Sequence, residues 1–196
     1  MISAVVLAAG LSRRMGKPKL LLELGAKTII EHVVSGVLKS KVGETIVVLG
    51  ANGQEIRQKL SGYDVKFIDN LRYADGQGTS VAAGAAAVNT EARGILFLMG
   101  DQPLIAPELM DRLIDLFNNS RAIIVRPGET GTPALFSTKL RDELMRLSGD
   151  TGGRQLMEKY KDEVQTVQVH PGPMYMDVDT EEDYQKMRQW WGSMRI

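Results

Sequence analysis

The chain has 196 residues, 24 Lys and Arg, 24 Asp and Glu, two histidines and no cysteine. The lack of cysteine excludes disulfides, thiolate zinc sites, iron–sulfur clusters and cysteine nucleophiles, and two histidines are too few for a histidine-rich metal centre. The balanced charge argues against nucleic acid or a membrane as partner, no apolar run is long enough to span a bilayer, and the N-terminus does not read as a secretory signal. We therefore expect a cytoplasmic protein with a single domain over residues 1–196.

Short apolar runs alternate with longer segments of helical periodicity. In chain order the pattern predicts a strand at 2–7, a helix at 28–39, a strand at 45–49, a helix at 54–60, a strand at 65–68, a helix at 79–88, a strand at 95–99, a helix around 109–117, strands at 122–125 and 134–136, helices at 139–147 and 153–160, strands at 164–169 and 175–178, and a helix at 180–191. Continuously apolar strands separated by helices favour a mostly parallel sheet covered on both faces. The expected fold class is α/β, a single three-layer Rossmann-like domain. Such sheets bind ligands beyond the carboxyl ends of their strands, so the polar residues that follow the apolar runs are the candidate site residues.

A basic, glycine-containing loop follows the first strand. Between Gly10 and Lys19 it carries Arg13, Arg14 and Lys17 and no acidic residue. Small residues let a ligand approach the backbone, and Arg14 and Lys19 can neutralise phosphate charge. The spacing matches neither a P-loop nor the dinucleotide-binding glycine motif, and a solvated basic loop is the alternative. Four unopposed cations after a buried strand favour an anion site.

Acidic residues follow two later strands. Asp101 ends a continuously apolar run, and Asp177 and Asp179 share one face of the strand expected at 175–178 because side chains alternate with a period of two. A turn or helix cap is the alternative role for each carboxylate. Carboxylates at separate strand ends, facing a cationic loop, are what a magnesium-bound triphosphate requires. Asp101 and Asp179 are therefore predicted to hold Mg²⁺.

Two glycine-rich segments open helices and are candidates for substrate contacts. In the first, Gly78 and Ser80 can place backbone and hydroxyl groups against a base or phosphate. In the second, at 148–154, Arg154 is a candidate anion ligand. An ordinary capped turn and a surface arginine are the respective alternatives. His170 lies in a Pro/Gly loop and is assigned no role.

Six stretches of the chain resemble one known family. They are LAAGLSRRMGKPKLLL, ADGQGTSVAAG, GDQP, GTPALF, LSGDTGGRQL and DVDTEEDY, and they spread from residue 7 to residue 184. They are similar to the nucleotidyltransferases of the nucleoside-diphosphate-sugar transferase type, and among these most of all to the molybdenum cofactor cytidylyltransferases. The chain departs from close relatives at Gly131-Thr132-Pro133, where the family pattern is Gly-His-Pro. This departure lies on the pterin side of the expected site.

The resemblance implies roles for named residues. Those implied to bind the nucleotide are Leu7, Ala8, Ala9, Gly10, Arg14, Lys19, Gly78, Ser80 and Asp101. Lys19, Arg14 and Asp101 are implied to be catalytic, and Asp101 and Asp179 to bind Mg²⁺, with Asp177 a weaker candidate. Because the methyl group of Ala9 narrows the space beside the backbone, we expect CTP to be preferred over GTP by roughly 10- to 200-fold.

The resemblance also implies a reaction. The terminal phosphate of molybdopterin would attack the α-phosphorus of CTP and release pyrophosphate, a reaction that needs charge neutralisation and positioning more than a strong base. A molybdenum hydroxylase or its accessory protein is a possible protein partner. Two alternatives stay open: a cytidylyl- or uridylyltransferase that acts on a sugar or polyol phosphate, and a non-catalytic molybdenum cofactor carrier.

Overall fold

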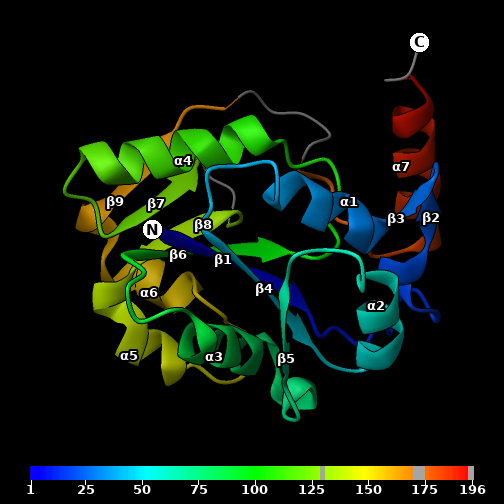
Figure 1. The fold of residues 1–196 in the computed structure, drawn as a ribbon, viewed down its shortest axis with the longest axis horizontal. Coiled ribbons are helices and arrows are strands. Elements are labelled where there is room, and N and C mark those ends of the chain that lie inside the picture. Colours follow the sequence, from blue (N-terminus) through cyan, green and yellow to red (C-terminus); the bar gives the residue numbers. More distant parts are fainter. Residues whose placement is uncertain (129–130, 170–174, 194–196) are drawn as a thin grey trace.

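A seven-stranded sheet in the order β5-β4-β1-β6-β8-β7-β9 runs through the centre of the computed structural model, which describes residues 1–128, 131–169 and 175–193 (Figure 1). Its strands are β1 (Ile2–Ala8), β4 (Glu44–Leu49), β5 (Lys66–Asp69), β6 (Gly94–Met99), β7 (Ile124–Pro127), β8 (Ala134–Ser137) and β9 (Val164–Val167). Among the described strands of this sheet only β8 runs antiparallel to its neighbours. A separate two-stranded ribbon pairs β2 (Glu23–Leu24) with β3 (Lys27–Thr28).

Helices cover both faces of this sheet. They are α1 (Ile29–Val37), α2 (Gly53–Lys59), α3 (Gln77–Ala87), α4 (Pro107–Asn119), α5 (Arg141–Met145), α6 (Arg154–Lys159) and α7 (Glu181–Ser193). One apolar cluster joins the sheet to α1, α2 and α4, and a second joins its other face to α3, α5 and α6. Figure 1 shows α1 and α4 on one side of the sheet and α3, α5 and α6 on the other. The predicted three-layer α/β fold is confirmed.

The central strand β1 has a core on each side. Ala4 and Val6 belong to the cluster under α1 and α4, whereas Val5 and Leu7 belong to the cluster under α3. Burial of every second residue on opposite faces explains why the run is continuously apolar rather than alternating. From β1 the chain fills one side of the sheet with β4 and β5 and then returns to place β6 on the other side. The strand order therefore reverses at β1 and β6, which is where such sheets bind ligands.

One predicted element is wrong. The residues expected to form a strand at 175–178 pair with no strand of the described sheet. The backbone amide of Val178 instead donates to the carbonyl oxygen of Asp101 at 3.2 Å, and the Val178 side chain is buried in the core. The segment crosses the end of β6 rather than extending the sheet, because its hydrogen bond goes to a loop and not to a strand edge.

The start of α1 follows the sequence closely. Thr28 and Glu31 form a reciprocal capping box, in which the carboxylate of Glu31 accepts from the amide and the hydroxyl of Thr28 at 2.8 and 2.7 Å.

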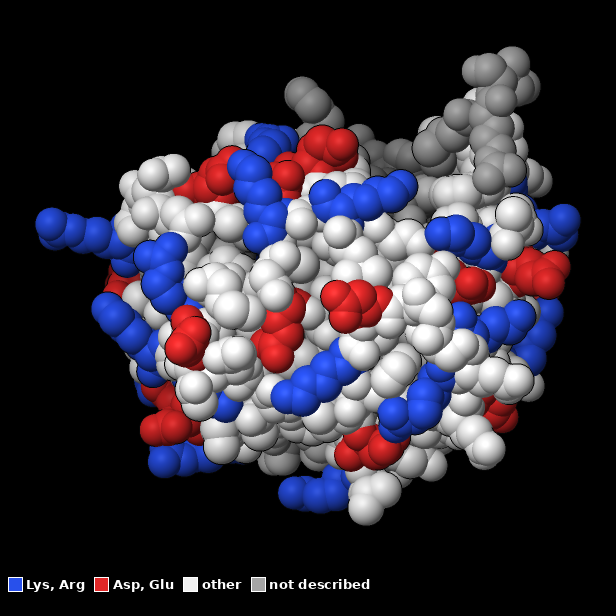
Figure 2. Space-filling view, viewed as in Figure 1, with Lys and Arg blue, Asp and Glu red and all other residues white. Residues whose placement is uncertain are grey.

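No helix among the described residues is long and apolar enough to cross a membrane. On the face drawn in Figure 2, Lys and Arg side chains are interspersed with Asp and Glu and form no extended patch of one sign.

Candidate active site

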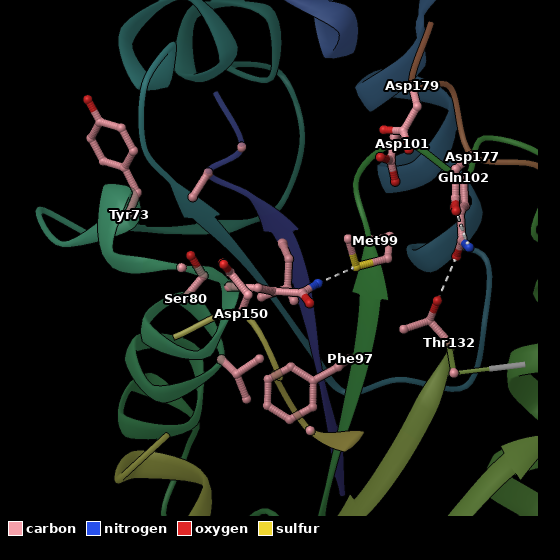
Figure 3. Close-up of a pocket in the computed structure, with 18 of the residues that line it drawn as sticks. Tyr73, Ser80, Phe97, Met99, Asp101, Gln102, Thr132, Asp150, Asp177 and Asp179 are labelled. Carbon is pink, nitrogen blue, oxygen red and sulfur yellow. Dashed lines mark hydrogen bonds between the residues drawn. The ribbon is translucent and has the colours of Figure 1, made fainter. Parts of the chain in front are cut away.

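A cavity of about 800 Å³ lies where β1 and β6 end, bordered by the start of α3 and the loop before α6. Most of the predicted residues line it: Leu7, Ala9, Gly10, Arg14, Lys19, Ser80, Arg154, Asp101, Asp177 and Asp179. Two predicted residues, Ala8 and Gly78, do not. Figure 3 places Asp101, Asp177 and Asp179 together on one side of the cavity, and Ser80 and Tyr73 on the other.

Lys19 joins the two predicted metal ligands. Its ammonium group donates a short hydrogen bond to Asp101 and another, of 2.7 Å, to Asp179. The Lys19 side chain is only 12% exposed. Burial acts to lower the pKa of Lys19, but the two carboxylates outweigh that effect and raise the pKa above its ordinary value. The cluster therefore joins three segments that lie far apart in the sequence.

Arg14 approaches the same cluster from the rim of the cavity. Its guanidinium contacts the second oxygen of Asp179 at 2.7 Å, while the Arg14 side chain is 72% exposed. Asp179 is thus shared between one buried and one exposed cation. We call Arg14, Lys19, Asp101 and Asp179 the charged end of the cavity. An exposed ion pair contributes little to stability, so Arg14 can leave Asp179 for a ligand at small cost.

The donor set of the charged end fits a divalent cation. Oδ1 of Asp101 is buried and accepts no hydrogen bond from the described residues. A buried carboxylate oxygen without a partner is costly unless a ligand satisfies it, and hard cations such as Mg²⁺ take carboxylate oxygens. The described residues contain no group of three or more acidic or histidine side chains that could hold a metal by themselves. Phosphate oxygens and water would therefore complete a coordination shell begun by Asp101 and Asp179.

Asp177 belongs to a second hydrogen-bonded chain beside the charged end. Its Oδ1 accepts from the amide nitrogen of Gln102 at 2.7 Å, and the amide oxygen of Gln102 accepts from the hydroxyl of Thr132 at 3.1 Å (Figure 3). Burial, and after it the negative charge of Asp101, raises the pKa of Asp177 above its ordinary value. The period-of-two argument for this residue was wrong because no strand forms, yet Asp177 and Asp179 both reach the cavity.

The start of α3 forms the opposite wall, which we call the helix end. Oγ of Ser80 and Oγ1 of Thr79 each accept from the amide nitrogen of Asn70, at 3.0 and 2.9 Å. Gln77 extends across the cavity, where its amide nitrogen lies 3.0 Å from the sulfur of Met99 on β6. Thioether sulfur is a weak acceptor, so this amide can exchange its partner for a ligand atom.

Gly78 packs against the backbone of the loop before α6. Its amide donates to the carbonyl oxygen of Gly149 at 2.7 Å, and a Cβ on Gly78 would lie 2.8 Å from backbone atoms of Ser148. Gly76 has a φ of 106°, and a Cβ there would come within 2.3 Å of Gly149. The two glycine-rich segments, predicted separately from the sequence, thus pack backbone against backbone. Only residues without side chains permit that approach.

The sequence did not predict Gln77, Gln102 and Thr132, which line the cavity, or Asn70, which donates to Thr79 and Ser80. Asn70 follows β5 and Gln102 follows β6, so the rule that polar residues after strands form the site would have found both. Arg13, on the basic loop, and Arg154, at the start of α6, also line the cavity, but neither forms an ion pair with Asp101 or Asp179. His170 lies outside the described residues.

Comparison with known proteins agrees with this geometry. The sequence profile of the MobA-like NTP transferase domain matches residues 4–164. The bifunctional protein GlmU of Francisella tularensis subsp. novicida is 39% identical over 120 residues, which are 60% of this chain and 26% of that protein. The chain therefore spans about a quarter of the length of the curated relatives it matches.

Two solved structures extend the likeness to almost the full chain. A nucleotidyl transferase from Methanothermobacter thermautotrophicus is 26% identical, with a TM-score of 0.87 and coverage of 100% of this chain and 99% of that one. Rv0371c of Mycobacterium tuberculosis, solved as a complex with manganese, is 28% identical, with a TM-score of 0.80 and coverage of 96% and 98%. Together with the profile match, these likenesses establish that the chain belongs to the MobA-like NTP transferase domain family.

Proposed function

We propose that this protein transfers CMP from CTP to the terminal phosphate of molybdopterin and releases pyrophosphate. The observation that carries the proposal is the charged end itself, where two cations and two carboxylates from separate segments meet beside the ends of β1 and β6. Triphosphate chemistry requires this combination of charges. The CTP and molybdopterin assignments rest on the sequence resemblance, and the family membership supports nucleotidyl transfer.

Nucleotide binding would exchange partners at the charged end. Without a nucleotide, Arg14 pairs with Asp179, and Lys19 pairs with both Asp101 and Asp179. A triphosphate offers these cations stronger charge-assisted hydrogen bonds, and the carboxylates then become available to a cation that arrives with the phosphates. Asp179 therefore acts as an internal substitute for phosphate before the nucleotide binds.

The chemical step needs no strong base from the protein. An acceptor phosphate is already ionised, so its oxygen attacks the α-phosphorus while the bond to the bridging β-phosphate oxygen breaks and pyrophosphate leaves. Lys19 neutralises charge on the phosphates, and the loop from Gly10 holds the nucleotide in line. A divalent cation bound by Asp101 and Asp179, when present, supplies further neutralisation of the developing charge. We assign Mg²⁺ as that cation.

The acceptor side carries a second candidate function. Thr132 stands where close relatives of the cytidylyltransferase type are expected to carry histidine, and its hydroxyl lies in the cavity network with Gln102. Because this position differs from the pattern of the cytidylyltransferases, we retain transfer to a sugar or polyol phosphate as the second candidate function. A molybdenum hydroxylase or its accessory protein would receive the product only under the first function.

A panel of nucleotides against acceptors tests the proposal. Pyrophosphate release is measured with CTP, UTP, GTP and ATP, each with molybdopterin or a sugar 1-phosphate, and with Mg²⁺ or Mn²⁺. We expect release with CTP and molybdopterin in Mg²⁺, together with a product whose mass equals molybdopterin plus CMP less water. Turnover of a sugar phosphate alone would favour the second candidate. Absence of pyrophosphate release with every pair would favour the remaining alternative, a non-catalytic molybdenum cofactor carrier.

A further inference from the structure

The chain Thr132–Gln102–Asp177 has a fixed hydrogen-bond direction. Gln102 faces Asp177 with its amide nitrogen, which donates to Oδ1 of Asp177 at 2.7 Å. The amide oxygen of Gln102 then faces Thr132, whose hydroxyl must donate. Gln102 is 7% exposed and held at both ends, so its amide cannot turn without losing both bonds.

This direction decides what the network offers to a ligand. Oδ1 of Asp177 is taken by Gln102, and Oδ2 accepts no hydrogen bond from the described residues, while the residue borders the cavity. The hydroxyl hydrogen of Thr132 is already committed to Gln102. The network therefore presents hydrogen-bond acceptors to the cavity. Asp101 and Asp179 lie nearby but are paired with Lys19 and Arg14, whereas Asp177 forms no ion pair within the described part of the chain. The carboxylate of Asp177 therefore disfavours a second anionic group beside it.

We propose that Asp177, positioned by Gln102, selects an acceptor substrate that presents an O–H or N–H donor beside its reacting phosphate. This inference rests on the proposed function and gives the acceptor a chemical class: a phosphate ester with hydroxyl or ring N–H groups and without a second anion near the phosphate. Asp177 is thus a specificity-determining residue, and Gln102 acts through it as a positioning residue. Neither residue contacts the nucleotide in this assignment.

The substitution Asp177→Asn tests the direction of the network. Asparagine keeps the shape, and its oxygen can still accept from Gln102, so its NH₂ group replaces the carboxylate oxygen that faces the cavity. The side-chain NH₂ group at position 177 then faces the O–H or N–H donor of the ligand, and no hydrogen bond can form between them. Two probes are used: molybdopterin, followed by its own fluorescence, and glucose 1-phosphate, followed by calorimetry. We expect the Kd of the probe that binds the unaltered protein to rise at least tenfold, while the Kd of CTP with Mg²⁺ changes less than twofold.

Glu182→Gln is the matched control. It removes one negative charge five residues further along the chain, from an exposed side chain that pairs only with Lys186 among the described residues. It should leave the Kd of both probes unchanged. Gln102→Leu should weaken probe binding in the parent but add little in the Asp177→Asn background, because Gln102 acts through Asp177. Thermal unfolding of each variant separates lost binding from lost folding.

Two outcomes would overturn the inference. One is that Asp177→Asn, still folded, binds both probes as tightly as the unaltered protein does; the other is that the unaltered protein binds neither probe. These titrations need no turnover. Absence of pyrophosphate release with molybdopterin therefore counts against the proposed function alone, and equal binding by Asp177→Asn counts against this inference alone.

Discussion

The charged end and the helix end of the cavity are held in place by different kinds of interaction. At the charged end, Lys19 contacts carboxylates 82 and 160 residues away in the sequence through ion pairs that a ligand can replace. At the helix end, Gly76 and Gly78 pack directly on the backbone of Ser148 and Gly149. The first arrangement can exchange partners when a ligand binds, whereas the second is set before any ligand arrives. Substitutions at the two ends should therefore fail in different ways.

The largest effect should come from a carboxylate of the charged end. Asp101→Asn keeps the shape but removes the charge, and we expect turnover to fall roughly 100- to 1,000-fold while the fold is kept. Asp179→Asn should behave similarly. Pyrophosphate release with CTP and Mg²⁺ is the measurement, and chelation of the metal should abolish release in the unaltered protein. Near-normal activity in both variants would reduce these residues to structural partners of Lys19.

Loss of Lys19 should act on nucleotide binding. A charge-assisted hydrogen bond to phosphate contributes about 1.5–3 kcal/mol, so Lys19→Ala should raise the Kd of CTP about tenfold or more. Calorimetry with CTP and Mg²⁺ measures this change. Arg14→Ala should have a smaller effect, because the Arg14 side chain is exposed and its interactions are screened by solvent. An unchanged Kd in both variants would remove the basic loop from the nucleotide site.

At the helix end the expected failure is structural. Gly78→Ala would push a methyl group into the backbone of Ser148, and we expect it to lower the free energy of unfolding by about 1–3 kcal/mol. Gly62→Ala is the matched control, because a Cβ there meets no atom within 4 Å, and its effect should stay within about 0.5 kcal/mol. Urea unfolding compares the two. Equal free energies of unfolding for the two variants would mean that the backbone at 148–149 can shift to accommodate the methyl group at little cost.

The smallest effect is expected at Ala9. The sequence placed its methyl group beside the base, but Ala9 is 5% exposed and its methyl carbon would lie 2.8 Å from a Cβ on Gly50. The methyl group thus packs toward the end of β4. Ala9→Gly should change the ratio of kcat/KM for CTP and GTP less than about tenfold, the low end of what one contacting methyl group contributes. A larger change would support selection of the base by Ala9, as the sequence predicts.

The sequence by itself determined the sheet, its helices and the segments that form the site. Hydrophobic periodicity specifies local structure, and polar residues after buried strands meet at one edge of a parallel sheet whatever the details of packing. Asp101 and Lys19 were predicted in this way, and Ser80 was predicted from the glycine-rich segment that opens a helix. A single strand assignment, at 175–178, failed because the partner of a backbone amide is chosen by tertiary contacts and leaves no local pattern.

Only the tertiary structure decided which groups touch. It joined Lys19 to both carboxylates, linked Asp177 to Thr132 through Gln102, and packed Gly78 against the backbone of Ser148. Each of these contacts joins residues at least 30 positions apart, and no spacing rule reaches across such a separation. Long-range contacts depend on how the layers pack, because the intervening chain can follow many different paths between the two partners. For that reason the sequence could predict which residue types form the site, but not which residues contact one another or which way their hydrogen bonds run.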